Sequence, residues 1–378
     1  MKVEQSSWTE AKGWGIQAPG RLGESAQLVL VFAGSPVLRR RQCLDEIKAV
    51  YPLACIVGCS TAGEILDTLV LEESLTCTAI RFDQTRIELA KIGLAEVQSS
   101  AQAGERLVRA LPAKGLVHVF VLSDGLKVNG SDLVNGMLSH LPKNVTVTGG
   151  LSGDGARFGE TFVVWDDEVM SESIVAIGLY GDRLKVGYGS LGGWDAFGPE
   201  RVITRSKGNI LYELDNESAL ALYKKYLGEQ AKGLPATGLL FPLSIRRKDR
   251  TPLVRTILSV NEQNQSMTFA GDIPEGAYAR LMKANFDRLI DGAAGAATTS
   301  YQAVGSVSPE LAILISSVGR KLVLGQRVEE EVENVRDALG PRPVLTGFYS
   351  YGEISPFTPS ARCELHNQTM TVTTLMEA

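Results

Sequence analysis

The strongest constraint on the fold of this chain is a pattern that occurs three times. Each copy has an apolar run, a helical segment, and a second apolar run that ends in a glycine-rich loop; the copies span residues 26–65, 115–154 and 310–354. The leading runs, such as "GLVHVFVLSDG", are continuous stretches rich in Val, Leu and Ile. Such runs are typical of strands that are covered on both faces. The strand–helix–strand order favours parallel pairing within each copy.

The segments between the copies predict further elements. Residues 161–194 alternate apolar residues with Asp-Asp and Gly-Asp turns, which predicts an antiparallel meander. Residues 216–230 predict an amphipathic helix, and residues 252–276 predict two strands around a polar turn. Residues 277–301 predict a long helix whose Ala- and Gly-rich end allows close packing.

The three copies are widely separated along the chain, so they indicate a repeat of architecture and not a solenoid. We therefore expect an α/β to α+β fold, in which mixed β-sheets covered by helices form two apposed lobes. The N-terminal lobe is expected to hold the first two copies and the C-terminal lobe the third. The predicted domains are residues 1–215 and 216–378.

Composition and charge exclude several classes of function. The chain has 378 residues, of which 44% are hydrophobic and 21% charged, as in soluble globular proteins. Its net charge is −5 and its one dense basic run, residues 244–250, is best explained as a solvated turn, so a nucleic-acid-binding face is not expected. No apolar run approaches the ~20 residues of a membrane helix, and the N-terminus lacks the apolar core of a signal peptide. These features predict a cytoplasmic protein that does not contact a membrane.

The five cysteines and three histidines also limit the chemistry. Without an export signal, the cysteines are expected to be reduced thiols. The histidines are His118, His140 and His366, too few for a His-rich metal centre.

The glycine-rich loops carry the polar residues best suited to a functional site. "GCSTAGEI" (58–65) and "GFYSYGEI" (347–354) both read Gly, four residues, Gly-Glu-Ile, and "GGLSGDG" (149–155) ends the second copy. A Walker loop requires Lys after the second Gly, where this chain has Glu64 and Glu353, whose charges would repel phosphate. A nucleophile elbow requires Gly-x-Ser-x-Gly, and "GCSTAG" misses that spacing by one residue.

Two interpretations of the loops remain. A hydrolase or transferase that uses Ser60 or Cys59 is the less favoured one, because either nucleophile needs a histidine base. The favoured one is a small-molecule pocket without catalytic residues, since such pockets form in crevices at the carboxyl ends of strands. For each polar residue, a structural role competes with ligand contact: the glutamates would cap the following backbone and hold the two lobes together. The loop residues predicted to contact a ligand are Cys59, Ser60, Thr61, Glu64, Gly150, Ser152, Asp154, Tyr349, Ser350, Tyr351 and Glu353.

Five segments together resemble the FIST family, named for F-box and intracellular signal transduction proteins. They are "GCSTAGEI", "TGGLSGD", "LVRTILSVNEQNQSMTFAGDIPEGAYARLM", "GFYSYGEISP" and "ELHNQTMTVTTL". The first two resemble the N-terminal FIST domain and the others the C-terminal one. They occur in the expected order and cover nearly the whole chain, so their combination is much more specific than any one of them.

The resemblance implies a sensory, ligand-binding protein with no known catalytic reaction. It implies a small molecule bound in a cleft between the lobes, for which amino acids have been proposed in the family. It also implies a separate signalling partner, such as a histidine kinase or a diguanylate cyclase.

Stand-alone members with both domains resemble a sub-group described as haem-binding nitric-oxide sensors of two-component systems, so haem b is an alternative ligand. His366, in "LHNQTM", is the candidate axial ligand. His118 is expected to be a core histidine, and His140 to lie at a helix end. Where the family often has a Cys before "VGR", this chain has Ser317, and we expect Arg320 to join the ligand-contacting residues at that strand end.

Overall fold

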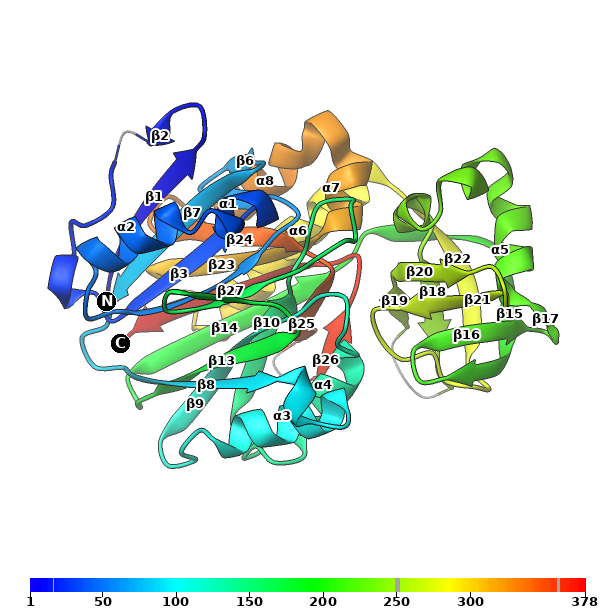
Figure 1. Ribbon diagram of the computed structural model, residues 1–378, viewed down its shortest axis with the longest axis horizontal. Helices are drawn as coiled ribbons and strands as arrows, with labels where there is room; N and C mark the ends of the chain where they lie inside the picture. Colours follow the sequence, from blue (N-terminus) through cyan, green and yellow to red (C-terminus); the bar gives the residue numbers. More distant parts are fainter. Residues whose placement is uncertain (16, 249–251, 359–360) are drawn as a thin grey trace.

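The computed structural model describes residues 1–15, 17–248, 252–358 and 361–378, which form two bodies (Figure 1). The larger body comprises residues 1–191 and 286–378, and residues 194–284 form a smaller body inserted between them. The two chain ends lie close together on the larger body, where the amino group of Met1 is 3.3 Å from the carboxylate of Glu377.

The larger body consists of three consecutive units, each built around one copy of the sequence pattern. Unit 1 contains β1 (Lys2–Thr9), β2 (Gly13–Trp14), η1 (Gly23–Ser25), β3 (Leu28–Ala33), α1 (Ser35–Arg39), α2 (Gln42–Val50), β4 (Cys55–Ser60), β5 (Glu64–Leu66), β6 (Leu69–Leu71) and β7 (Ser74–Arg81). Unit 2 contains β8 (Arg86–Gly93), η2 (Leu94–Glu96), α3 (Ser100–Arg109), β9 (Leu116–Ser123), α4 (Gly130–Leu138), β10 (Thr146–Leu151), β11 (Val163–Trp165), β12 (Glu168–Met170) and β13 (Ser173–Tyr180). Unit 3 contains β14 (Leu184–Leu191), α6 (Phe286–Ala303), β23 (Leu311–Ser317), α7 (Val318–Leu324), η5 (Gly325–Arg327), α8 (Val328–Leu339), β24 (Val344–Ser350), β25 (Gly352–Pro356), β26 (Cys363–His366) and β27 (Met370–Glu377).

Each unit forms the centre of one sheet, and the strand order is the same in all three. Sheet 1 has the order β12-β11-β4-β3-β7-β1-β2, sheet 2 the order β26-β25-β10-β9-β13-β8, and sheet 3 the order β6-β5-β24-β23-β27-β14. In each sheet the two strands of the sequence pattern pair in parallel, as predicted: β3 with β4, β9 with β10, and β23 with β24.

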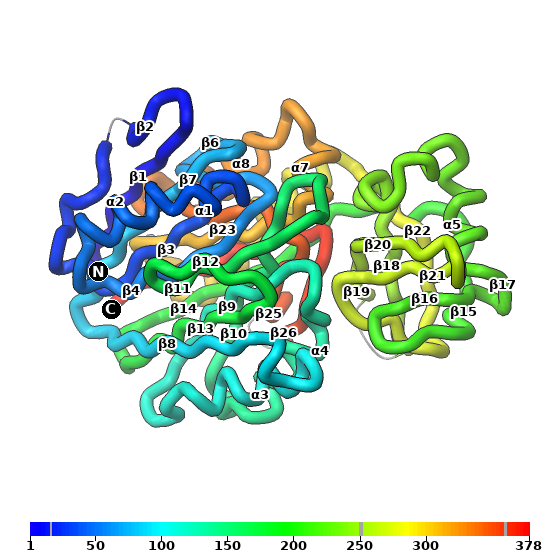
Figure 2. Tube along the Cα trace, viewed as in Figure 1, coloured from blue at the N-terminus to red at the C-terminus, as the bar shows by residue number. Residues whose placement is uncertain are grey.

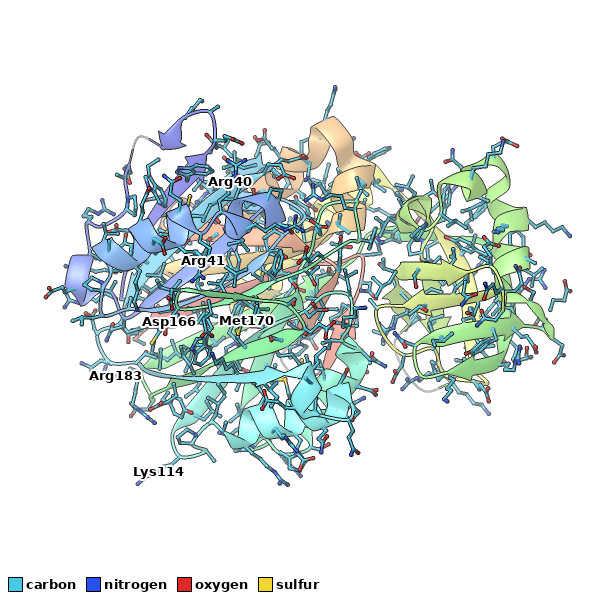
Figure 3. The ribbon with its side chains drawn as sticks, viewed as in Figure 1. Arg40, Arg41, Lys114, Asp166, Met170 and Arg183 are labelled. Carbon is cyan, nitrogen blue, oxygen red and sulfur yellow. The ribbon has the colours of Figure 1, made fainter. Side chains whose placement is uncertain are left out.

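The outer end of each sheet is supplied by a different unit. The β5–β6 hairpin of unit 1 extends sheet 3, the β11–β12 hairpin of unit 2 extends sheet 1, and β25–β26 of unit 3 extends sheet 2. Figure 3 labels Asp166 and Met170 on one of these exchanged hairpins, β11–β12. The exchange forms a closed cycle, so none of the three sheets is complete without a neighbouring unit.

Equivalent glycines stand in the second parallel strand of each unit. A Cβ atom on Gly58 would lie 2.0 Å from the carbonyl oxygen of Val31 in the neighbouring strand. The corresponding distance is 1.9 Å at Gly149 and 1.8 Å at Gly347, each measured to the strand residue paired with it. Real Cβ atoms do not approach a carbonyl oxygen so closely, so the pairing at these positions requires glycine.

Apolar side chains from all three sheets meet in the centre of the larger body. Leu30 of sheet 1, Phe120 of sheet 2 and Ile313 of sheet 3 belong to one buried cluster. The rings of Phe32 and Phe348, from sheets 1 and 3, have centroids 4.7 Å apart. The helices cover the outer faces: α2 packs on sheet 1, α3 and α4 on sheet 2, and α6 and α8 on sheet 3.

The smaller body is a twisted sheet with one main helix. Its strand order is β19-β18-β22-β15-β16-β21-β20, with β17 paired to β16. The last two residues of the basic run, 249 and 250, lie outside the described residues. The elements are β15 (Trp194–Lys207), β16 (Ile210–Leu214), β17 (Glu217–Ser218), α5 (Ala219–Leu227), η3 (Gly228–Gly233), η4 (Ala236–Leu240), β18 (Leu243–Arg246), β19 (Leu253–Arg255), β20 (Ile257–Asn261), β21 (Ser266–Phe269) and β22 (Tyr278–Ala284).

The predicted fold class is confirmed: the sheets are mixed, helices cover them, and the strand–helix–strand unit recurs. Three details of the sequence interpretation are wrong. The third copy is not in a separate lobe, because strand exchange builds all three copies into one body. The meander over 161–194 contains strands, but they belong to three different sheets. The helix over 277–301 begins only at Phe286, because residues 278–284 form β22, which pairs on both sides with β15 and β18.

The predicted domain boundary near residue 215 falls within the smaller body, between β16 and β17. This boundary stays a prediction.

We expect Gly58→Ala to destabilise the protein by about 2 kcal/mol, because the added methyl group must displace the neighbouring strand. Gly159→Ala is the matched control, since a Cβ there would be 3.5 Å from a carboxylate oxygen of Asp154, an ordinary van der Waals distance. Urea unfolding of both variants measures the difference. Equal stability of the two would contradict the close strand approach.

Candidate ligand-binding site

The three glycine-rich loops meet where the parallel strands end. Each loop donates at least one backbone hydrogen bond to another loop, and three of these bonds form a ring. The donors and acceptors are Ala62 N–H to the Tyr349 carbonyl (2.8 Å), Gly153 N–H to the Ser60 carbonyl (2.9 Å) and Tyr351 N–H to the Leu151 carbonyl (3.3 Å). The loops around Gly58, Gly149 and Gly347 therefore converge, and they hydrogen-bond directly to one another.

Glu64 stabilises the first loop from inside. Its side chain is completely buried. One carboxylate oxygen accepts a hydrogen bond from the Thr61 hydroxyl, and the other accepts from the Ser74 hydroxyl (2.5 Å) and backbone N–H (3.1 Å). Burial raises the pKa of Glu64 from 4.5 to about 7, although these donors and Lys321 act to lower it.

Glu353 has the same role in the third loop. It is also completely buried, and it accepts from the Ser350 hydroxyl (2.7 Å) and from the Thr369 hydroxyl (2.9 Å) and backbone N–H (3.1 Å). Burial raises its pKa from 4.5 to about 8. Both glutamates thus bind backbone N–H groups, which is the structural role considered for them above. Glu64 binds the start of β7, and Glu353 binds the residue before β27.

The second loop is longer and covers the other two. Phe158 stacks on Tyr351 with ring centroids 4.6 Å apart, and the Tyr351 hydroxyl donates to the carbonyl of Gly155 (3.0 Å). Arg157 bridges Asp154 (2.7 Å) and Glu73 (2.8 Å) at the surface. Beneath these residues, the Ser152 hydroxyl donates to the Ser123 carbonyl (2.8 Å). A Cβ atom on Gly150 would lie 2.9 Å from the Ile315 side chain of unit 3.

Arg320 and Tyr349 belong to a buried polar cluster, one member of which was not predicted from the sequence. The missing member is Glu331 of α8, which is completely buried. It accepts from the Arg320 guanidinium (2.7 and 3.0 Å), the Tyr349 hydroxyl (2.7 Å) and the Ser316 hydroxyl (3.0 Å). Glu331 lies in an acidic run at the start of α8, so its sequence gave no signal that it faces the core.

The predicted nucleophiles have no base. The Ser60 hydroxyl donates to the Gly153 carbonyl (2.8 Å) and accepts from the Phe162 N–H (2.9 Å). Cys59 is completely buried, and burial raises the pKa of its thiol well above the ordinary value. In the described ranges, no histidine hydrogen-bonds either residue. The hydrolase alternative therefore lacks the group that it requires.

A polar seam between the two bodies was not identified from the sequence. Arg255 of β19 is almost fully buried there and donates to the carbonyls of Leu365 (2.8 Å) and Asp272 (3.3 Å) and to the Ser131 hydroxyl (3.3 Å). These acceptors are neutral, and burial lowers the pKa of Arg255 to about 10. Asn129, which caps α4, donates to the Asp272 carboxylate (2.8 Å).

The turn before β27 connects this seam to the three loops. Asn367 donates to the carbonyl of Tyr351 (3.1 Å) and accepts from the N–H of Thr256 in the smaller body (3.3 Å). Gln368 donates to the Thr256 hydroxyl and the Leu239 carbonyl, both at 3.1 Å. The side-chain carbonyl of Gln368 is buried and has no hydrogen-bond partner among the described residues. Asn367 and Gln368 both lie in the sequence motif "ELHNQTM", which belongs to the segments that resemble the FIST family.

The three histidines have distinct surroundings. His118 is a core histidine, as expected, with its ring nitrogens 2.7 and 2.9 Å from the hydroxyls of Thr146 and Thr148. His140 follows α4 at the surface and is 3.4 Å from Glu105. His366 is buried, with Nε2 2.7 Å from the Ser355 carbonyl and Nδ1 without a partner among described residues. Burial lowers the pKa of His118 and His366 to about 3, so both are neutral.

Family models match this chain over most of its length. The FIST N domain matches residues 27–217 and the FIST C domain matches residues 219–356. The chain belongs to the FIST family. FIST domains are associated with sensing in signal transduction and not with catalysis.

Other comparisons add little to this assignment. An uncharacterized protein of Methanocaldococcus jannaschii is 22% identical over 301 residues, which cover 73% of this chain and 57% of that protein. The chain thus spans just over half the length of that relative. A crystal structure of cyanuric acid hydrolase from A. caulinodans covers 78% of this chain and 68% of its own, with 9% identity and a TM-score of 0.22, which is too low to support any conclusion.

Two features are absent from the described residues. No helix among them has the length and apolar character needed to span a membrane. They contain no group of three or more His, Cys, Asp or Glu residues arranged to hold a metal ion. Ligand contact by the predicted loop residues stays a prediction.

The two buried glutamates should make stability fall as the pH rises. Unfolded, they lose their protons near pH 4.5, whereas in the folded protein they hold them to about pH 7 and 8, so raising the pH favours unfolding across this window. His118 and His366 act oppositely, but only below about pH 6.5. We therefore expect the free energy of unfolding to decrease from pH 6.5 to 8, by an amount on the order of 2 kcal/mol.

Urea unfolding at several pH values tests this expectation. Glu353→Gln should flatten the decrease, since glutamine has no proton to lose. Glu160→Gln, at a surface carboxylate paired with Arg39, is the control and should keep the wild-type slope. A slope that Glu353→Gln leaves unchanged would show that the carboxylic acid does not titrate in this range.

Proposed function

We propose that this protein is a ligand-binding sensor that detects a small molecule at the seam between its two bodies. The supporting observation is the polar character of the seam: it buries the guanidinium of Arg255 against neutral acceptors and the unpaired side-chain carbonyl of Gln368. Buried polar groups that lack full partners are costly for stability, so each needs an explanation, and a ligand that completes the hydrogen bonding is the one we propose here.

The connection between the bodies suits a sensor. Two chain segments join the bodies (Figure 2): one leads into β15 at Trp194, and the other leaves β22 at Ala284. Trp194 and Ala284 lie opposite each other in the sheet, so the two connections are adjacent. Two adjacent connections form a hinge, and hinge motion around a ligand is a common way to transmit binding. Asn367 hydrogen-bonds both the third loop and the smaller body, so a ligand in the seam would act on the ring of loops. A separate signalling protein, such as a histidine kinase or diguanylate cyclase, would detect that change.

Haem b is a second candidate ligand, and one observation favours it. Nε2 of His366 lies 2.7 Å from the Ser355 carbonyl, which identifies Nε2 as the protonated nitrogen and leaves the lone pair of Nδ1 free. A metal-binding histidine commonly donates its other ring N–H to a carbonyl, but that donor is most often Nδ1, whereas here it is Nε2. The space around it does not fit: the side chain is 1% exposed and the Phe357 ring centroid is 4.0 Å away. Haem binding would require this region to open, and when bound the iron would supply coordination of a diatomic gas.

The seam proposal is tested by thermal unfolding with each of the twenty amino acids as probes. We expect at least one to raise the unfolding temperature of the wild type, and Gln368→Ala to abolish that increase. Gln84→Ala, at an exposed position outside the seam, should keep it. An increase that survives in Gln368→Ala would place the ligand elsewhere.

The haem alternative is tested by the absorption spectrum after addition of hemin. A Soret band that His366→Ala abolishes and His140→Ala retains would establish His366 as the axial ligand. The absence of a band in the folded wild type would exclude haem and leave the seam proposal unaffected.

A further inference from the structure

A groove of about 800 Å³ opens where sheet 1 meets sheet 3, next to the N-terminal hairpin. This volume is within the range of roughly 300–1,000 Å³ that is typical of small-molecule sites. Its wall is formed by one face of β1 and by the exchanged β5–β6 hairpin. The residues that matter here are Gln5, Ser7, Thr9, Trp14, Leu66 and Leu69.

The repeat of the three units shows how the equivalent seam between sheets 1 and 2 is filled. There, Lys91 of β8 faces the exchanged β11–β12 hairpin. Its ammonium group is 2.7 Å from the Glu168 carboxylate and 5.1 Å from the centroid of the Trp165 indole. An aromatic ring and a charged pair therefore close this seam.

At the seam between sheets 2 and 3, β14 carries Tyr188, whose side chain is only 7% exposed. Tyr188 in β14 is equivalent to Gln5 in β1. Ser190 pairs with Thr371 as Ser7 pairs with Thr76, and Tyr188 and Gln5 each lie two residues before those serines.

In the seam between sheets 1 and 3, each filling residue is replaced. By strand register, Ser7 stands where unit 2 has Lys91, because Ser7 pairs with Thr76 as Lys91 pairs with Val175. Leu66 and Leu69 pair with each other, as Trp165 and Glu168 do in the other hairpin. The replacements lack the indole, the ammonium and the carboxylate, and the groove lies at the equivalent positions.

The lining of the groove indicates what it accepts. Leu66, Leu69 and Trp14 offer apolar and aromatic surface, and the Ser7 and Thr9 hydroxyls have no side-chain hydrogen bond to any described residue. Two charged residues also line the groove: Asp67, whose carboxylate pairs with Arg336, and Lys12, which is exposed. We propose that this groove is a second binding site, separate from the seam between the bodies, for a planar aromatic molecule that carries a hydrogen-bond donor.

Indole is the probe, because it reproduces the Trp165 side chain that fills the equivalent seam. We expect ligand-observed NMR to show that the full chain binds indole, and that 1-methylindole, which has no donor, binds more weakly. The triple variant Ser7→Lys/Leu66→Trp/Leu69→Glu places the filling residues of the second seam in the groove and should weaken indole binding by at least about tenfold, or roughly 1.4 kcal/mol.

The reverse variant, Lys91→Ser/Trp165→Leu/Glu168→Leu, is the matched control. It should keep the original site and gain a second indole site, and thermal unfolding confirms that both variants fold. The proposal is overturned if the wild type does not bind indole up to its solubility limit, or if the filled variant binds it equally. Equal affinity for indole and 1-methylindole would refute the role of the hydroxyls.

Discussion

The larger body depends on a closed exchange of strands among three units, which the ring of backbone hydrogen bonds between their loops completes. Each loop follows a fully buried strand, so its N–H and carbonyl groups cannot be satisfied by water. They are satisfied by the next loop: Ala62 bonds to Tyr349, Gly153 to Ser60, and Tyr351 to Leu151. Because the cycle is closed, no unit can bury its strand ends alone.

This constraint explains the composition of the loops. Glycine is required at 58, 149 and 347 by the approach of the neighbouring strand. Small hydroxyl residues and the two glutamates then bind the returning chain: Glu64 holds Ser74, and Glu353 holds Thr369. Residues that look suited to a ligand are occupied by the protein's own backbone. The price of this arrangement is two buried carboxylic acids with raised pKa values.

Because the larger body repeats one unit three times, features that occur in only one unit stand out from the repeat. The inserted body interrupts only unit 3, and its contacts with the turn at Asn367 and Gln368 create polar groups that the other units do not need. The groove beside β1 is likewise a place where one unit lacks what another has. In both regions the departure from the repeat, and not the repeat itself, suggests where a ligand binds.

The sequence by itself determined the elements of the repeat, the parallel strand pairs, and the family, because these depend on local periodicity and on short motifs. It also indicated that the glycine loops converge. Only the tertiary structure decided that the loops close on one another, that Glu331 pairs with Arg320, and that residues 278–284 form a strand. The physical reason is that many hydrogen-bond partners in this fold are far apart in the sequence: Ala62 of unit 1 bonds to Tyr349 of unit 3, and Arg255 is 110 residues from Leu365. Local pattern carries no record of such pairings.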